Sequence, residues 1–108
     1  MARRGPLVKS VKVGPYRYRV VYDNVYLDSI NALGVVRPKE LTIMVKSGFD
    51  PLYELQIIFH ELRHATLEVQ AEYALNDNEA FVDRDASAWL ALLIDNQSLL
   101  TAIRGIAK

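Results

Sequence analysis

The sequence predicts a single α+β domain in which a small, mostly antiparallel N-terminal sheet is followed by three helices. Two observations predict this order. Before residue 47 the apolar residues are rich in Val and Tyr and alternate with polar ones, as in half-buried strands. After residue 50 they recur every three to four residues, as on one face of a helix. A chain of 108 residues, 51% of them hydrophobic, is long enough for one packed core, and no repeat or linker divides it.

A strand pair is expected near the start of the chain. Residues 11–22 are rich in Val and Tyr, and Gly14-Pro15 interrupts them, which predicts a short strand, a turn and a second strand over residues 16–22. Residues 1–9 contain the breaker Gly5-Pro6 and are expected to form a flexible or edge segment.

A hairpin is expected next. Residues 23–31 predict only a loop with a short turn, whereas the β-rich runs 32–37 and 40–46 flank Pro38-Lys39 as the two strands of a hairpin would. The second run could act as an edge strand that holds an extended peptide by main-chain hydrogen bonds. The alternative is that it is simply the last strand of a small sheet.

Three helices are expected in the rest of the chain. Asp50-Pro51 supplies a capping carboxylate and a proline for the first helical position, so a helix is expected from there to about residue 73. A second helix is expected from about residue 77 to 95, and a short third one over residues 99–106 is expected to close the core. The apolar residues expected to face the core are Leu55, Ile58, Phe59, Leu62 and Val69 in the first helix, Phe81, Val82, Ala86, Trp89, Leu92 and Leu93 in the second, and Leu99, Leu100, Ile103 and Ile106 in the third.

The first of these helices carries the pattern HExxH, from His60 to His64. Residues four apart share a helix face, so the two histidines can direct two imidazole nitrogens at one point. Zn²⁺ accepts such a pair in a tetrahedral shell that takes a third protein ligand and leaves a corner for water. Glu61 would then lie beside the metal, where its carboxylate can take a proton from that water. The alternative is a helix with two ordinary histidines on its half-buried face.

The third ligand has to be a carboxylate, because the chain has no cysteine and its 2 histidines are both in the motif. Glu79, near the start of the next helix, is the best placed, and Asp83 could accept the remaining N–H of a ligand histidine. Asp83 and Glu68 are the fallback ligands. The alternatives are a capping box between Asn76 and Glu79, and a solvated acid at Asp83.

The two motifs resemble a known signature. HExxH at residues 60–64 followed by Asn78-Glu79-Ala80-Phe81-Val82-Asp83 is similar to the HExxH and NExxxD motifs of thermolysin-like gluzincins, with a shorter gap between them. That family also has a further transition-state histidine, for which this chain has no candidate. The resemblance implies His60, His64 and Glu79 as zinc ligands, Glu61 as general base and Asp83 as the partner of a ligand histidine.

A second resemblance, to the small ImmA/IrrE-like metallopeptidases of phages and mobile elements, covers most of the chain from about residue 9. Those proteins open with a Lys-Val-Gly-Pro-aromatic strand, matched by residues 12–16. They also carry a C-terminal segment after Asp-Asn-Pro, matched at residues 95–97 except that Gln97 replaces the proline. The resemblance implies a minimal zincin-like domain that is zinc-dependent and in some members cuts a repressor protein.

Composition narrows the class of protein. With 13 basic and 13 acidic side chains the formal net charge is zero, which gives no electrostatic case for a nucleic-acid binder. Basic residues do gather near the start of the chain. They indicate a solvated segment or, alternatively, a phosphate-binding arm. They are Arg3, Arg4, Lys9, Lys12, Arg17 and Arg19. The chain shows no signal-type apolar region and no run of about eighteen apolar residues, so a cytoplasmic protein outside the membrane is expected.

The sequence therefore predicts a zinc-dependent metallo-endopeptidase that acts on a protein or peptide and can require a partner protein for targeting. Tyr73 and Tyr53 are the phenols near the motif that could donate a hydrogen bond to a tetrahedral oxyanion, although such tyrosines usually pack. The alternative function is a catalytically weak or inactive, metal-stabilised interaction module. Glu61 separates the two, because a binding module needs only the metal ligands.

Overall fold

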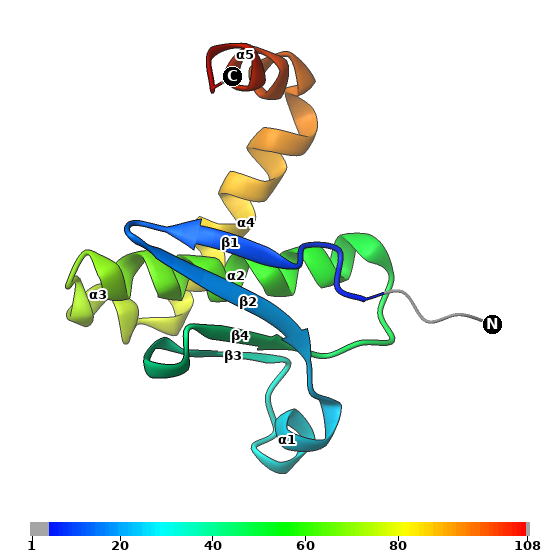
Figure 1. Ribbon diagram of the computed structural model, residues 1–108, viewed down its shortest axis with the longest axis vertical. Helices are drawn as coiled ribbons and strands as arrows, with labels where there is room; N and C mark the ends of the chain where they lie inside the picture. Colours follow the sequence, from blue (N-terminus) through cyan, green and yellow to red (C-terminus); the bar gives the residue numbers. More distant parts are fainter. Residues whose placement is uncertain (1–4, 108) are drawn as a thin grey trace.

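The computed structural model describes residues 5–107 as a four-stranded sheet with one long helix across a face and shorter elements around it (Figure 1). The strands are β1 (Ser10–Val13), β2 (Tyr16–Tyr22), β3 (Gly34–Arg37) and β4 (Thr42–Val45), and a 3-10 turn, Pro38–Glu40, joins the last two. The helices are α1 (Asn24–Ser29), α2 (Pro51–Val69), α3 (Tyr73–Asn76), α4 (Glu79–Asp95) and α5 (Gln97–Ala107). The predicted α+β class, with an N-terminal sheet followed by helices, is confirmed.

The sheet has the strand order β1-β2-β4-β3, and both expected strand pairs form. The turn between β1 and β2 is Gly14-Pro15, as predicted, since Val13 pairs with Tyr16. Gly14 has a φ of 58°, and a Cβ atom there would lie 2.8 Å from Val69 Cγ1. Both the backbone conformation and the close approach of α2 therefore require glycine at this turn.

The place of β4 differs from the prediction that residues 40–46 could form an edge strand. β4 pairs in parallel with β2 on one side and antiparallel with β3 on the other, so it lies inside the sheet. The reason is the crossover after β2, which carries the chain past the position that β4 later fills. The edge strand of this half of the sheet is therefore β3.

Part of that crossover is a helix where only a loop was expected. The Asp23 side chain accepts the backbone N–H of Tyr26 at 3.0 Å and so caps α1. Leu27 is completely buried by this short helix. Six residues are too few for a helical period to be recognised in the sequence, and only the capping Asp signals the helix.

The core lies between the sheet and α2, which begins as predicted, with Asp50 accepting the N–H of Tyr53. Tyr18, Val20, Ile43 and Val45 point from the sheet toward Ile57, Ile58 and Ala65 of the helix. The buried stripe of α2 differs from the predicted one because it includes two carboxylates. Leu55, Phe59, Leu62 and Val69 are only half-buried, whereas Glu54 is 0% and Glu61 6% exposed.

The two ends of α2 connect it to neighbouring segments. At its start the Glu54 carboxylate accepts the Tyr22 hydroxyl at 2.6 Å and the Leu7 N–H at 2.8 Å. Of the segment 1–9 that was expected to be flexible or at an edge, residues 1–4 lie outside the described residues. At its other end α2 finishes at Val69, earlier than expected, because Ala71 adopts a φ of 59° and α3 follows.

The C-terminal part departs most from the sequence prediction. Val82, Ala86 and Leu90 of α4 are buried, but Trp89 and Leu92, expected in the core, are 53% and 44% exposed. No residue of α5 is buried, so the prediction that this helix closes the core is wrong. The reason is that α4 continues without a break to Asp95 and carries α5 away from the sheet (Figure 1). Within residues 5–107 no helix combines the length and apolar character of a membrane span.

Candidate metal centre

Three of the predicted metal ligands lie together where α2 meets the start of α4. The rings of His60 and His64, one turn apart on α2, have centroids 4.9 Å apart. Glu79 is the first residue of α4, directly after Asn78, whose side chain caps the helix by accepting the Phe81 N–H. The Glu79 carboxylate is 3.1 Å from His60 Nε2 through Oε2 and 2.7 Å from His64 Nε2 through Oε1.

The spacing of these atoms suits a single metal ion. One donor atom from each of His60, His64 and Glu79 lies within 4.8 Å of the others, and this is the one such group within residues 5–107. Tetrahedral ligands with bonds of about 2.1 Å are about 3.4 Å from one another, which is close to the His–Glu distances here. Two imidazoles and a carboxylate, with 69% of the Glu79 side chain exposed, form a group that can hold a metal ion at the protein surface.

The second nitrogen of each histidine faces an oxygen atom. His64 Nδ1 lies 2.5 Å from Asn76 Oδ1, and His60 Nδ1 lies 3.4 Å from Asp83 Oδ1. An N–H donated from Nδ1 fixes the tautomer that leaves Nε2 free to bind a metal. Asp83 therefore lies beside His60, one of the two histidines that could bind a metal, as the sequence predicted.

Asn76 has a different role from the one considered in the sequence. The capping box with Glu79 is wrong, because Asn78 is the cap residue and Glu79 follows it directly. Instead Asn76 ends α3, accepts from His64 and donates to Glu68 Oε2 at 3.4 Å. Glu68 thus contacts the histidine through Asn76 and is not one of the three donors.

Glu61 lies beside this group, below the surface. Burial raises the pKa of its carboxyl from 4.5 to about 7, while His60 and His64 lower that pKa and Glu79 raises it. Glu61 and the three donor residues line the same cavity, so the carboxyl lies in their neighbourhood. A buried carboxyl beside a metal-binding group is the arrangement that general-base chemistry needs.

The backbone of β3 fixes one side of Glu61. A Cβ atom on Gly34 would lie 2.9 Å from Glu61 Cγ, 3.0 Å from its Oε2 and 3.0 Å from Ile57 Cγ2. Only glycine lets the strand approach so closely. Sequence reasoning missed Gly34, and a glycine that opens a β-rich run was the available signal.

A cleft of about 730 Å³ opens over the site. Its lining includes residues 33–36 of the β3 edge, Tyr53, Gln56 and Ile57 of α2, and the three donors His60, His64 and Glu79. Of the two phenols proposed as oxyanion donors, Tyr53 lines the cleft. Tyr73 is 58% exposed and is not among the residues that line it.

Comparison with known proteins adds no assignment. No protein-family model matches the chain, and neither the curated proteins nor the solved structures include a significant match. The class of site therefore rests on its geometry, which defines a two-histidine, one-carboxylate group able to hold a metal ion.

Proposed function

We propose that the protein is a zinc-dependent endopeptidase of the gluzincin type. The observation that carries the proposal is the buried Glu61 carboxyl beside the His60, His64 and Glu79 donors, in a cleft bordered by a strand edge. Zn²⁺ bound by those donors supplies a Lewis acid and a water of lowered pKa. The likeness of residues 60–64 and 78–83 to HExxH and NExxxD supports the same assignment. We propose a cytoplasmic location, which the lack of cysteine supports.

In this proposal Glu61 moves the proton. Its carboxylate takes a proton from the water that attacks the peptide carbonyl, and then gives that proton to the nitrogen as the C–N bond breaks. Gly34 holds the carboxylate from the strand side, and Asn76 and Asp83 hold the histidines. Tyr53, which lines the cleft, is the better placed of the two phenols to donate to the carbonyl oxygen.

The substrate is a protein or peptide bound in extended form along β3. We assign to β3 the role of substrate-binding edge strand that the sequence suggested for residues 40–46, because β3 is at the edge of the sheet and borders the cleft. Main-chain groups of an edge strand bind a peptide with little regard to its side chains. A domain of 108 residues has little room for deep specificity pockets, so in this proposal a partner protein brings the substrate to the cleft.

The test compares Glu61→Gln with wild type after loading with zinc, using an unstructured protein substrate and mass spectrometry of the products. Loss of a general base lowers the rate by about 10²–10⁴ while the zinc content stays at one ion per chain. Glu72→Gln, an exposed carboxylate outside the cleft, is the control and leaves the rate unchanged. A Glu61→Gln protein as active as wild type would overturn the proposal.

The second candidate function is a metal-stabilised interaction module, and the apolar surface of the C-terminal helices favours it. Zinc content of protein purified without added metal separates this candidate from a metal-free fold. Wild type is expected to hold one zinc ion and His64→Ala none. If zinc binds and no substrate is cut, the site has a binding role only.

A further inference from the structure

The outer part of α4 and the whole of α5, residues 89–107, form what we call the C-terminal arm. It projects from the body of the protein (Figure 1). Its exposed large apolar residues are Trp89 at 53%, Leu92 at 44%, Ile94 at 43%, Leu99 at 38%, Ile103 at 50% and Ile106 at 86%. At about 200 Å² for each fully exposed side chain, these six residues present roughly 600 Å² of apolar surface along the arm.

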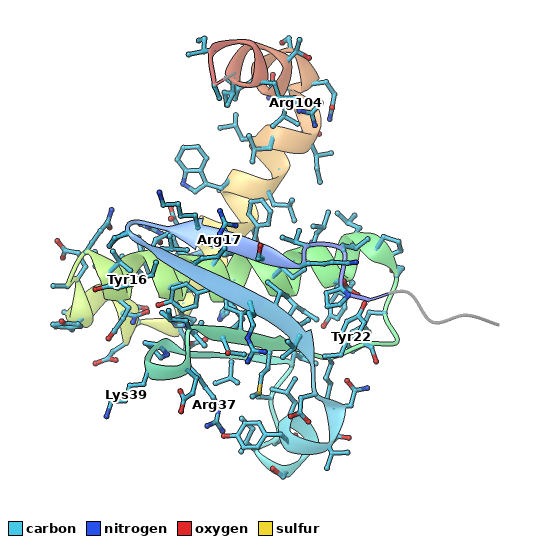
Figure 2. All side chains as sticks on the ribbon, in the orientation of Figure 1. Tyr16, Arg17, Tyr22, Arg37, Lys39 and Arg104 are labelled. Carbon is cyan, nitrogen blue, oxygen red and sulfur yellow. The ribbon has the colours of Figure 1, made fainter. Side chains whose placement is uncertain are left out.

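The arm's last helix has two distinct faces. Leu99, Leu100, Ile103 and Ile106 recur at helical spacing and form one apolar stripe, whereas Ser98, Thr101 and Arg104 lie on the opposite face. Residues 89–107 contain one acidic residue, Asp95, and one basic residue, Arg104, which Figure 2 labels on the arm, so their charges balance. A helix with this pattern is stabilised by packing its stripe against another apolar surface.

A matching apolar surface exists on the body. An open groove of about 310 Å³ lies where α4 crosses α2, and we call it the α2–α4 groove. Its lining residues are Phe59, Leu62, Arg63, Thr66, Ala86, Trp89 and Leu93. The only charged group among them, Arg63, is paired with Asp85 at 2.6 Å, so the groove presents mainly apolar atoms.

The α5 helix of the same chain does not occupy this groove. A single non-helical residue, Asn96 with φ −132° and ψ 71°, joins α4 to α5, and α5 lies at the far end of α4 (Figure 1). A short connection between an extended helix and the body favours exchange of that helix between two chains. The stripe and the groove are thus two apolar surfaces that do not contact each other within one chain.

We propose that the protein forms a symmetric dimer in which α5 of each copy packs its Leu99, Ile103 and Ile106 stripe into the α2–α4 groove of the other. The contact forms twice, once for each copy. The three stripe residues present roughly 350 Å² in each copy and cover a similar area of the groove that receives them, so the two contacts bury roughly 1,400 Å² in all, which is within the range of a stable interface. The neutral arm meets no net repulsion from the second copy.

Cysteine cross-linking tests this arrangement directly, because the chain has no cysteine of its own. Thr66→Cys, in the groove, and Ile103→Cys, in the stripe, are made in separate chains carrying different tags, then mixed and oxidised. A disulfide-linked heterodimer on a non-reducing gel is expected. Thr101→Cys on the opposite face of α5 is the matched control, and with Thr66→Cys it gives at least tenfold less product.

Placing both cysteines in one chain shows whether α5 packs on the other copy or on its own chain. A Thr66→Cys/Ile103→Cys chain that forms its disulfide at the mass of a monomer would show that α5 folds into its own groove, and would overturn the proposal.

Light scattering gives the second measurement. Wild type is expected at twice the chain mass of 12.2 kDa, whereas Ile103→Glu weakens the dimer at least tenfold and Thr101→Glu does not.

Because Ile103 is half exposed, Ile103→Glu is expected to fold normally, which circular dichroism checks. A wild-type monomer at about 100 µM, or a dimer that Ile103→Glu leaves intact, would each contradict the proposed contact. The dimer does not depend on the proposed peptidase activity. Zinc content and hydrolysis are therefore measured separately on the same variants.

Discussion

The amide oxygen of Asn76 lies 2.5 Å from Nδ1 of His64, so a residue at the end of α3 orients a histidine of the candidate metal site on α2. Asn76 in turn donates to Glu68, which holds its amide in place. This chain of contacts sets the direction in which the His64 Nε2 lone pair points.

Removal of the Asn76 side chain should therefore weaken metal binding without removing a ligand. We expect Asn76→Ala to lower the affinity for Zn²⁺ about 10–100-fold, as is usual when a partner of a ligand histidine is lost. Competition with a chromophoric chelator measures this. Asp77→Ala, at the next and exposed position, is the control, and equal affinities in the two variants would show that Asn76 has no orienting role.

Gly34 gives a second prediction, because a Cβ atom there would lie within about 3.0 Å of Glu61 and Ile57 side-chain atoms. Gly34→Ala inserts a methyl group 3.0 Å from Glu61 Oε2, so either the carboxylate or β3 has to move. We expect a loss of about 1–3 kcal/mol in the free energy of unfolding and a lower rate of hydrolysis, with metal affinity kept. Urea denaturation and zinc titration measure these effects.

Gly105 provides the control for that substitution. A Cβ atom at Gly105 meets no atom within 4 Å, and the residue lies in a helix. Gly105→Ala should therefore leave stability unchanged or raise it by up to about 1 kcal/mol. If both alanine variants behave alike, the close approach of Gly34 to Glu61 is not a constraint on the site.

The part of the site that could be predicted from sequence is the part that local geometry determines. The helical period places His60 and His64 on one face, and a short connection between two helices brings Glu79 back toward them. Asp83 follows from the same period, one turn after Glu79. None of these inferences needs to know how the sheet is arranged.

The residues that sequence reasoning missed act through contacts between distant elements. Gly34 meets Glu61 because β3 packs against α2, and the place of a strand in the sheet is not encoded in the periodicity of that strand. Asn76 meets His64 only because α3 folds back after Ala71. The apolar pattern of α5 likewise shows that a surface must cover it and does not say which surface.

Glu54 and Tyr22 give a prediction about the start of α2. The buried Glu54 carboxylate accepts the Tyr22 hydroxyl at 2.6 Å, and Tyr22→Phe removes that donor. We expect a loss of about 1–3 kcal/mol in the free energy of unfolding, since a buried carboxylate is left with one hydrogen bond fewer. Tyr16→Phe, at the other and exposed end of β2, is the control and should change stability by less than about 0.5 kcal/mol (Figure 2). Similar losses in the two variants would rule out a special role for the hydrogen bond between Tyr22 and Glu54.

The raised pKa of Glu61 predicts how pH affects the stability of the metal-free protein. Because the carboxyl has a pKa of about 7 in the folded chain and 4.5 ordinarily, folding favours its protonated form. Its contribution to stability is therefore complete below pH 4.5 and is lost as pH rises through 7.

Glu61→Gln keeps the shape of the protonated side chain and cannot ionise, so it removes this pH dependence. Relative to wild type, the variant should gain on the order of 3 kcal/mol in the free energy of unfolding between pH 4.5 and pH 8. Urea denaturation at both pH values, with a chelator present, measures the gain. The two proteins are compared at each pH, so groups that titrate alike in both cancel in the difference between their free energies of unfolding. Only groups coupled to Glu61 do not cancel. The variant and wild type could instead differ in free energy of unfolding by the same amount at both pH values. That result would mean that the folded protein holds Glu61 in a polar, hydrated position rather than beneath the metal-binding group.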